Sequence, residues 1–194
     1  MAPLPESYRQ IIGLLRLVSG SDVWPPLASE LEIIQLTKNH AEFAEKLRKL
    51  GLENAANLVS ANARYVGLRW MALGRNHLHA AQQALQFNFD GAAFSRAYCA
   101  AYNASKSVRY IVNGRVSLKG DDHGEASELP DDFPDVDRWS EAITRLYEHR
   151  LRADYDNWRT TTSEMSLSAS DAVDLAGGFI EAANDYLLQR FETE

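Results

Sequence analysis

The sequence has little cysteine and no long apolar run. Its single cysteine, Cys99, cannot form a disulfide within the chain, and no cysteine and histidine residues are grouped at the spacing of zinc ligands. No stretch approaches the roughly 20 apolar residues that a membrane-spanning helix needs. The apolar run at residues 11–18 is short and is interrupted by Arg16. These absences favour a cytoplasmic protein, and we expect no membrane segment, no metal site and no cofactor.

Basic residues are outnumbered, with 20 Lys and Arg against 27 Asp and Glu, so the net charge is −7. This charge argues against a general nucleic-acid coat protein, although a field depends on how the charges are arranged as well as on their sum. Residues 91–119 carry five basic side chains and no carboxylate, and residues 121–141 carry nine acidic ones. We expect the acidic block to lie over the basic helix, within one chain or across a dimer, where it would compete with a polyanion.

Strand patterns and internal repeats are also missing, whereas apolar residues recur at three- and four-residue steps through most of the chain. This spacing predicts an all-α fold. Asn113-Gly114 should end the helix at residues 91–112, since glycine adopts the left-handed conformation of a C-terminal cap. Residues 113–137 should form a long connection. The predicted helices cover residues 6–18, about 28–49, from about 53 past 65, 66–86, 91–112, 138–158, and from about 168 onward.

The predicted helices fall into two parts. We expect residues 1–65 to form an N-terminal helical extension and residues 66–194 to form an antiparallel four-helix bundle. The helix at residues 91–112 should be central, because its apolar stripe is mostly alanine and lets a neighbouring helix come close. That stripe contains Phe94, Ala97, Ala101, Ala104, Val108 and Ile111.

Several segments of the bundle are similar to a known family. In order they are SRAYCAAYNASK at residues 95–106, a loop holding His123, LYEHRLRADYD at residues 146–156 and SASDAVDLAGGFIEAANDYL at residues 168–187. Together, over roughly residues 66–190, they resemble the HEPN domain superfamily (higher eukaryotes and prokaryotes nucleotide-binding). The resemblance implies an antiparallel helical bundle that commonly forms a homodimer, with a groove between the protomers.

The resemblance also implies a function. Many family members are toxins, defence proteins or RNA-processing factors, and others act beside a minimal nucleotidyltransferase. Family ribonucleases cut RNA without metal, using an Arg and a His separated by four to six residues; no histidine of this chain follows an arginine in that way. The resemblance predicts a dimeric module that binds RNA, a nucleotide or a partner protein in a toxin–antitoxin or antiphage system, without the usual ribonuclease motif.

Tyr98, Tyr102, Lys106 and Arg109 are candidate ligand-binding residues. They lie at helical spacing in the stretch without carboxylates, and tyrosine rings can stack on bases while the cations hold phosphates. Alternatively, the two tyrosines pack inside the bundle or at a dimer interface, where one apolar body and one polar tip suit them.

Arg150, Arg152 and Asp154 are further candidates. Arg150 continues an apolar stripe with Asp154 one turn later, and Arg152 and Asp156 repeat that spacing. A guanidinium braced by a carboxylate can bind phosphate through two hydrogen bonds. The alternative is an ion pair that fixes helix packing, because an unpaired charge on an apolar stripe would be costly.

Two other functions remain open on the sequence. The first is a metal-independent ribonuclease with a non-standard site, in which Arg75 acts with His79, or His149 acts with Arg150 or Arg152. The second is a structural interaction protein without a ligand, whose N-terminal helices dock a partner. Whether the chain is an enzyme is not decided by the sequence.

Overall fold

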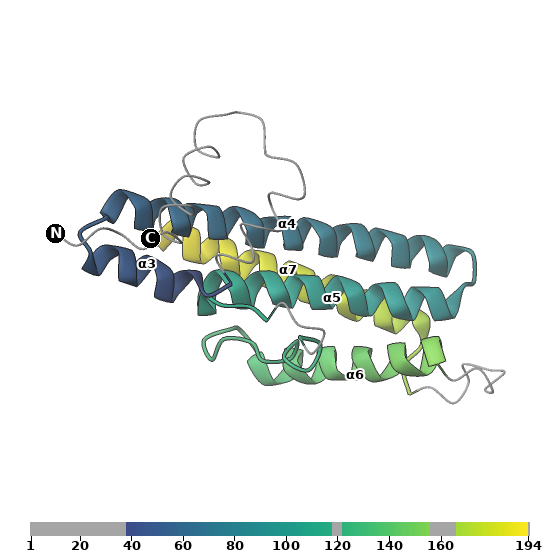
Figure 1. Ribbon diagram of the computed structural model, residues 1–194. Helices are drawn as coiled ribbons and strands as arrows, with labels where there is room; N and C mark the ends of the chain where they lie inside the picture. The colour runs from purple at the N-terminus through teal and green to yellow at the C-terminus, as the bar shows by residue number, and fades with distance from the viewer. Residues whose placement is uncertain (1–37, 118–121, 156–165, 194) are drawn as a thin grey trace.

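A computed structural model describes residues 38–117, 122–155 and 166–193, and these residues form five helices without a strand. The all-α prediction is confirmed for this part of the chain, and the helices build a bundle (Figure 1). The helix predicted at residues 6–18 and the start of the one at 28–49 lie outside the described residues. The five helices are α3 (His40–Lys49), α4 (Glu53–Gln86), α5 (Asp90–Asn113), α6 (Val136–Tyr155) and α7 (Ala169–Thr193).

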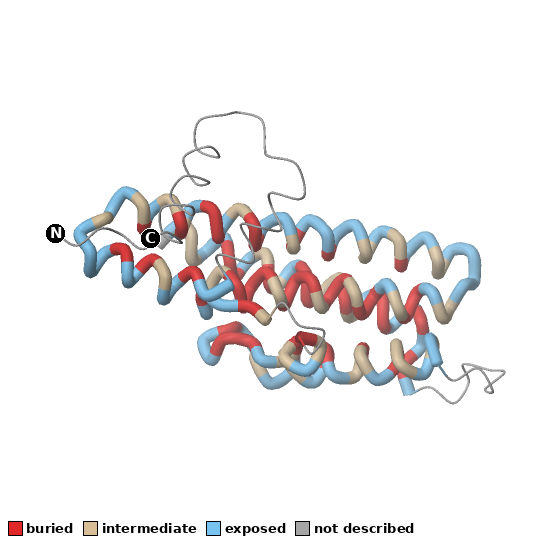
Figure 2. Tube along the Cα trace, in the orientation of Figure 1, coloured by how far each residue is buried: buried red, intermediate tan, exposed pale blue. Residues whose placement is uncertain are grey.

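Helix α5 is the centre of the bundle, as predicted, because it packs against α4, α6 and α7. Figure 2 shows it buried along most of its length, whereas the outer helices are exposed on one side. The buried side chains are mainly small, so the neighbouring helices approach the α5 backbone closely. They include Ala93, Ala97, Ala100, Ala101 and Ala104.

Helix α4 lies close to the α5 backbone at Gly74. A Cβ at that position would lie 2.9 Å from the carbonyl oxygen of Ala100, which is closer than real Cβ atoms come to backbone. Glycine therefore sets the distance between the two helices here. Helix α4 has 34 residues and runs without interruption through the predicted division at residues 65/66.

The end of α5 fastens α3 to the bundle. Gly114 has the left-handed φ of 71° that was predicted for the cap. Its carbonyl accepts a hydrogen bond from the Ala41 amide at 3.2 Å, and the Val116 amide donates to the Lys38 carbonyl at 2.8 Å. Helices α3 and α4 share a small core of their own, made of Ala44, Leu47, Ala56 and Val59.

The connection from α5 to α6 is fixed to α7. Asp132 accepts hydrogen bonds from Tyr186 and Arg190, each at 2.7 Å. Helix α7 begins with a reciprocal cap, because the Asp171 amide donates to Ser168 Oγ at 3.0 Å and the Asp171 carboxylate accepts from the Ser168 amide at 3.3 Å. The start predicted for this helix is confirmed.

Candidate functional site

Residues 122–128, which we call the acidic turn, follow α5 and lie on the basic face of that helix within the same chain. The Asp122 side chain is 2% exposed and accepts hydrogen bonds from Tyr102 at 2.6 Å and Lys106 at 2.9 Å. Arg109 lies 3.3 Å from the same carboxylate. Burial acts to raise the pKa of Asp122, but the Tyr102 hydroxyl and the two cations outweigh burial and hold that pKa below its usual value.

Arg109 is sealed beneath this turn. Its side chain is 5% exposed, and besides Asp122 it pairs with Glu125 at 3.3 Å. Its Nε donates to Ser105 Oγ at 3.2 Å. The sequence predicted Lys106 and Arg109 to be offered to a ligand, whereas in this structure both side chains bind the chain's own carboxylates.

His123 follows Asp122 and lies among tyrosine rings from α5 and α6. Its ring centroid is 4.5 Å from that of Tyr102 and 6.1 Å from that of Tyr147, and it is nearly parallel to the latter. Beneath them, the fully buried Tyr98 places its hydroxyl 2.8 Å from His123 Nδ1. The pairing of Asp122 with α5 therefore holds the imidazole on a platform of three tyrosines.

The protonation of this pair follows from its surroundings. Burial lowers the pKa of His123, helped by the nearby charge of Arg150, and burial raises the pKa of Tyr98. At neutral pH the imidazole is therefore neutral and the phenol protonated. The buried phenol hydrogen needs an acceptor, so Tyr98 donates to Nδ1 and His123 carries its own proton on Nε2.

Arg150 lies at the edge of the same platform. Its guanidinium carbon is 5.7 Å from the centre of the Tyr98 ring, and its Nε donates to Asp154 at 2.9 Å. The Arg150 and Asp154 side chains are 21% and 28% exposed. The predicted pair has formed, and it leaves part of the guanidinium open to solvent.

We call this group the His123 site. It joins α5, α6 and the turn between them, and it presents half-buried rings, one imidazole N–H and one guanidinium at a single place on the surface. Such a surface suits a ligand with a flat ring and an oxyanion. The group consists of Tyr102, His123, Tyr147 and Arg150, which are partly exposed, and of the fully buried Tyr98 beneath them.

The sequence reasoning did not select His123 and Tyr147 as ligand-binding residues. Tyr147 lies three residues before Arg150, which puts both on one face of α6, and that spacing was readable. His123 could have been found from its neighbour, because a carboxylate that pairs with the basic helix brings the next residue to the same helix.

The other predicted residues lie elsewhere. Arg75 is exposed and donates a hydrogen bond to Asn184 of α7. The exposed His79 contacts Gln83 at 3.1 Å. Arg75 and His79 therefore bind different residues. Arg152 is exposed and lies about 200° around α6 from Arg150, at about 100° per residue. Asp156 lies outside the described residues.

His149 is buried away from Arg150. It is 2% exposed and stacks on Phe94 at 5.6 Å between ring centroids. Its Nε2 lies 3.2 Å from Ser166 Oγ, and burial lowers its pKa. A neutral imidazole packed in this way supports the end of α6, and the structure does not bring it together with an arginine at an open surface.

The described residues contain neither a metal-binding cluster nor a membrane-spanning helix. No three His, Cys, Asp or Glu side chains are grouped so that they could hold a metal ion. Among the same residues, no helix has the length and apolar character required to cross a membrane.

Comparison of the chain with protein-family models, with curated proteins and with solved structures gives no match in any of the three. The resemblance to HEPN domains therefore rests on the segments quoted above.

Proposed function

We propose that this chain is a HEPN-like four-helix module that binds a phosphate-bearing ligand, single-stranded RNA or a nucleotide, at the His123 site. The observation that carries this proposal is the meeting of His123 and Arg150 on one tyrosine platform. These residues come from a turn and a helix that are far apart in sequence.

Each part of the site has a task in this proposal. Tyr147 and Tyr102 offer ring faces on which a base stacks, which contributes about 1–3 kcal/mol per base in known single-strand binders. The Arg150 guanidinium and the His123 Nε2–H both donate hydrogen bonds, so they suit the oxygens of one phosphate. Asp154 holds Arg150 in place at 2.9 Å. The site would thus recognise its ligand through stacking and charge, without hydrogen bonds that distinguish one base from another.

The test is binding of a short fluorescent single-stranded RNA, followed by anisotropy at low salt. Arg150→Ala should weaken binding about tenfold, the loss of one charge-assisted contact. Arg152→Ala is the matched control, because it removes the same charge from another face of α6 and should change binding little. Equal losses in both variants, or no binding at all, would contradict the proposal. Competition with adenosine monophosphate separates a nucleotide site from one that needs a longer strand.

A metal-independent ribonuclease is the second candidate, and the specific observation in its favour is the neutral His123 beside Arg150. Base catalysis requires the other tautomer, in which Nδ1 donates to Tyr98 and Nε2 is free to accept a proton. Nε2 would then take the proton of a ribose 2′-hydroxyl as that oxygen attacks phosphorus, Arg150 would stabilise the charge on the phosphoryl oxygens, and the imidazolium would return the proton to the leaving 5′ oxygen. Incubation with mixed RNA in the presence of EDTA tests this. Cleavage that is lost in His123→Ala and kept in His79→Ala would support it.

The assembly that we propose is a homodimer in the cytoplasm, acting in a toxin–antitoxin or antiphage system beside a nucleotidyltransferase-like or other defence protein. This part follows from the family resemblance alone. A molecular mass from light scattering that equals one chain at every concentration would exclude the homodimer.

A further inference from the structure

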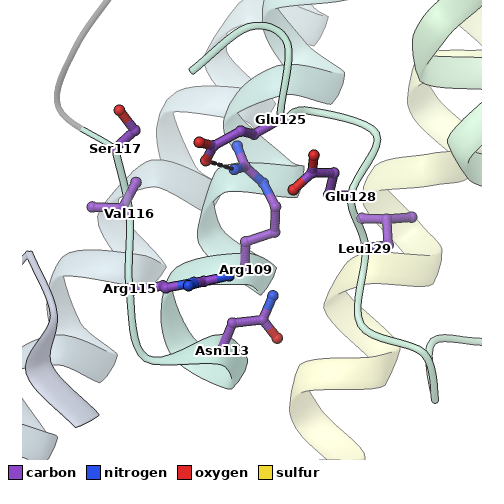
Figure 3. A pocket seen from close by; sticks show the side chains of 8 residues that line it. All are labelled: Arg109, Asn113, Arg115, Val116, Ser117, Glu125, Glu128 and Leu129. Carbon is purple, nitrogen blue, oxygen red and sulfur yellow. Dashed lines mark hydrogen bonds and ion pairs between the residues drawn. The ribbon is translucent and has the colours of Figure 1, made fainter. Parts of the chain in front are cut away.

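A cavity lies on the other side of the acidic turn, away from the tyrosine platform. It has a volume of about 360 Å³, which is within the range of small-molecule sites. Figure 3 shows Arg115 reaching in from the segment after α5, while Glu125 and Glu128 reach in from the acidic turn. The lining consists of Arg109, Asn113, Arg115, Val116, Ser117, Glu125, Glu128 and Leu129.

Two arginines and two glutamates line this cavity, and only one arginine and one glutamate among them form an ion pair. Arg109 and Glu125 bind each other at 3.3 Å. Arg115 and Glu128 have opposite charges and line the same cavity, yet neither side chain has an ion-pair or hydrogen-bond partner among the described residues. A cation and an anion that line the same cavity without forming an ion pair leave room for a ligand group between them.

Arg109 adds a donor at the base of the cavity. Its side chain is almost fully buried, and its Nη2 has no hydrogen-bond partner within the part of the chain that the structure describes. A buried donor without an acceptor is costly, so such a group is often explained by something the site holds. Val116 and Leu129 supply apolar surface to the lining.

We infer that this cavity binds a small zwitterion of the amino-acid type. Its carboxylate would lie toward Arg115 and the Arg109 Nη2, and its ammonium group toward Glu128. An apolar side chain would pack on Val116 and Leu129. A simple anion would meet two carboxylates and a simple cation two guanidinium groups, whereas a zwitterion matches both walls. This inference does not depend on the function proposed for the His123 site.

Titration calorimetry of the full-length protein with a panel of the standard L-amino acids tests the inference. We expect an apolar member such as leucine to bind. The same molecule without its carboxylate (isoamylamine) or without its ammonium group (4-methylpentanoate) should bind at least about tenfold more weakly, because each loses one charge-assisted pair.

Arg115→Gln and Glu128→Gln should each weaken leucine binding about tenfold. Both side chains are exposed, so both variants should fold, which thermal unfolding checks. Arg138→Gln and Glu141→Gln on α6 remove the same charges elsewhere and should leave binding unchanged. The inference is overturned if no amino acid binds even at a concentration of about 10 mM, which would detect a dissociation constant far weaker than that of typical sites. It is also overturned if inorganic phosphate or 4-methylpentanoate binds as well as leucine, or if the two pocket variants bind normally.

Discussion

Arg109 and Arg150 both form ion pairs with carboxylates, and they differ in how much of the side chain remains exposed to solvent. The Arg109 side chain is 5% exposed and lies against two carboxylates. The Arg150 side chain is 21% exposed and has Asp154 as its ion-pair partner. The first arginine serves the fold of the acidic turn, and the second keeps donor capacity for a ligand. Burial, and not residue type, separates the two.

The difference also explains the arrangement of charge in the sequence. The acidic block neutralises Lys106 and Arg109 on the central helix and thereby fixes the turn that carries His123. The stretch without carboxylates is thus not an open basic groove. Around Lys106 and Arg109 it is one half of a structural contact, and the guanidinium of the His123 site comes from α6.

Asp122→Ala has the largest expected effect on stability. It leaves Arg109 and Lys106 buried without their shared carboxylate, and removing one member of a buried ion pair typically costs 3–5 kcal/mol, so we expect a loss of about 3 kcal/mol in the free energy of unfolding. Urea denaturation measures it. Glu141→Ala, an exposed change on α6, should stay within about 0.5 kcal/mol, and a similar loss in both variants would show that Asp122 is not special.

The next effect concerns pH. The pKa of His123 is lower in the folded chain than its ordinary value, so the unfolded chain binds the proton more readily. The contribution of His123 to stability is therefore complete above about pH 6.5, the unfolded value, and is lost as the pH falls through the folded pKa.

Several other histidines also have lowered pKa values, so the measurement is a difference between two proteins. His123→Gln should make the fall in unfolding free energy between about pH 7 and about pH 5 less steep than in the natural chain. Parallel curves would mean that His123 is protonated as easily in the folded chain as in the unfolded one.

A smaller effect on stability is expected for Arg150→Ala. Because the ion pair with Asp154 is partly exposed, its loss should cost no more than about 1 kcal/mol, while RNA binding falls as described above. The split between folding and binding is the opposite of that expected at Asp122. A stability loss as large as that of Asp122→Ala would place Arg150 among the structural residues.

The smallest effect should come from Glu125→Gln. Its carboxylate is 45% exposed although it touches the buried Arg109, so water screens the pair and we expect a loss of a few tenths of a kcal/mol. Thermal unfolding at low and high salt checks this, since the small difference should shrink further in salt.

Much of the fold was readable because local rules decide it. The alanine stripe predicted α5 as the central helix, Asn113-Gly114 predicted its end, and Asp171 marked the start of α7. The long connection was predicted only as a loop. Its bonds to α7 through Asp132 join residues 54 and 58 positions apart, and no local pattern encodes such a contact.

The candidate site was readable in part. Helical spacing placed Arg150 beside Asp154 and brought Tyr98 and Tyr102 to one face. Spacing could not tell which side chains would be covered, so Arg109 was expected to be open and His123 was not selected. Covering depends on the path of the turn, and that path is held by long-range contacts such as the buried Asp122 with Lys106 and Arg109 and the Ser105 hydroxyl with the Ala126 carbonyl.

Helix α4 is a single rod of 34 residues, which at 1.5 Å per residue is about 50 Å long. Because this helix is continuous, a displacement that a partner causes through α3 at one end is transmitted to the other end of α4. A chain cut at residues 65/66 would sever this rod and leave a third of it behind. Gly51, with its left-handed φ of 73°, lies between α3 and α4, so a cut there would break neither of these helices.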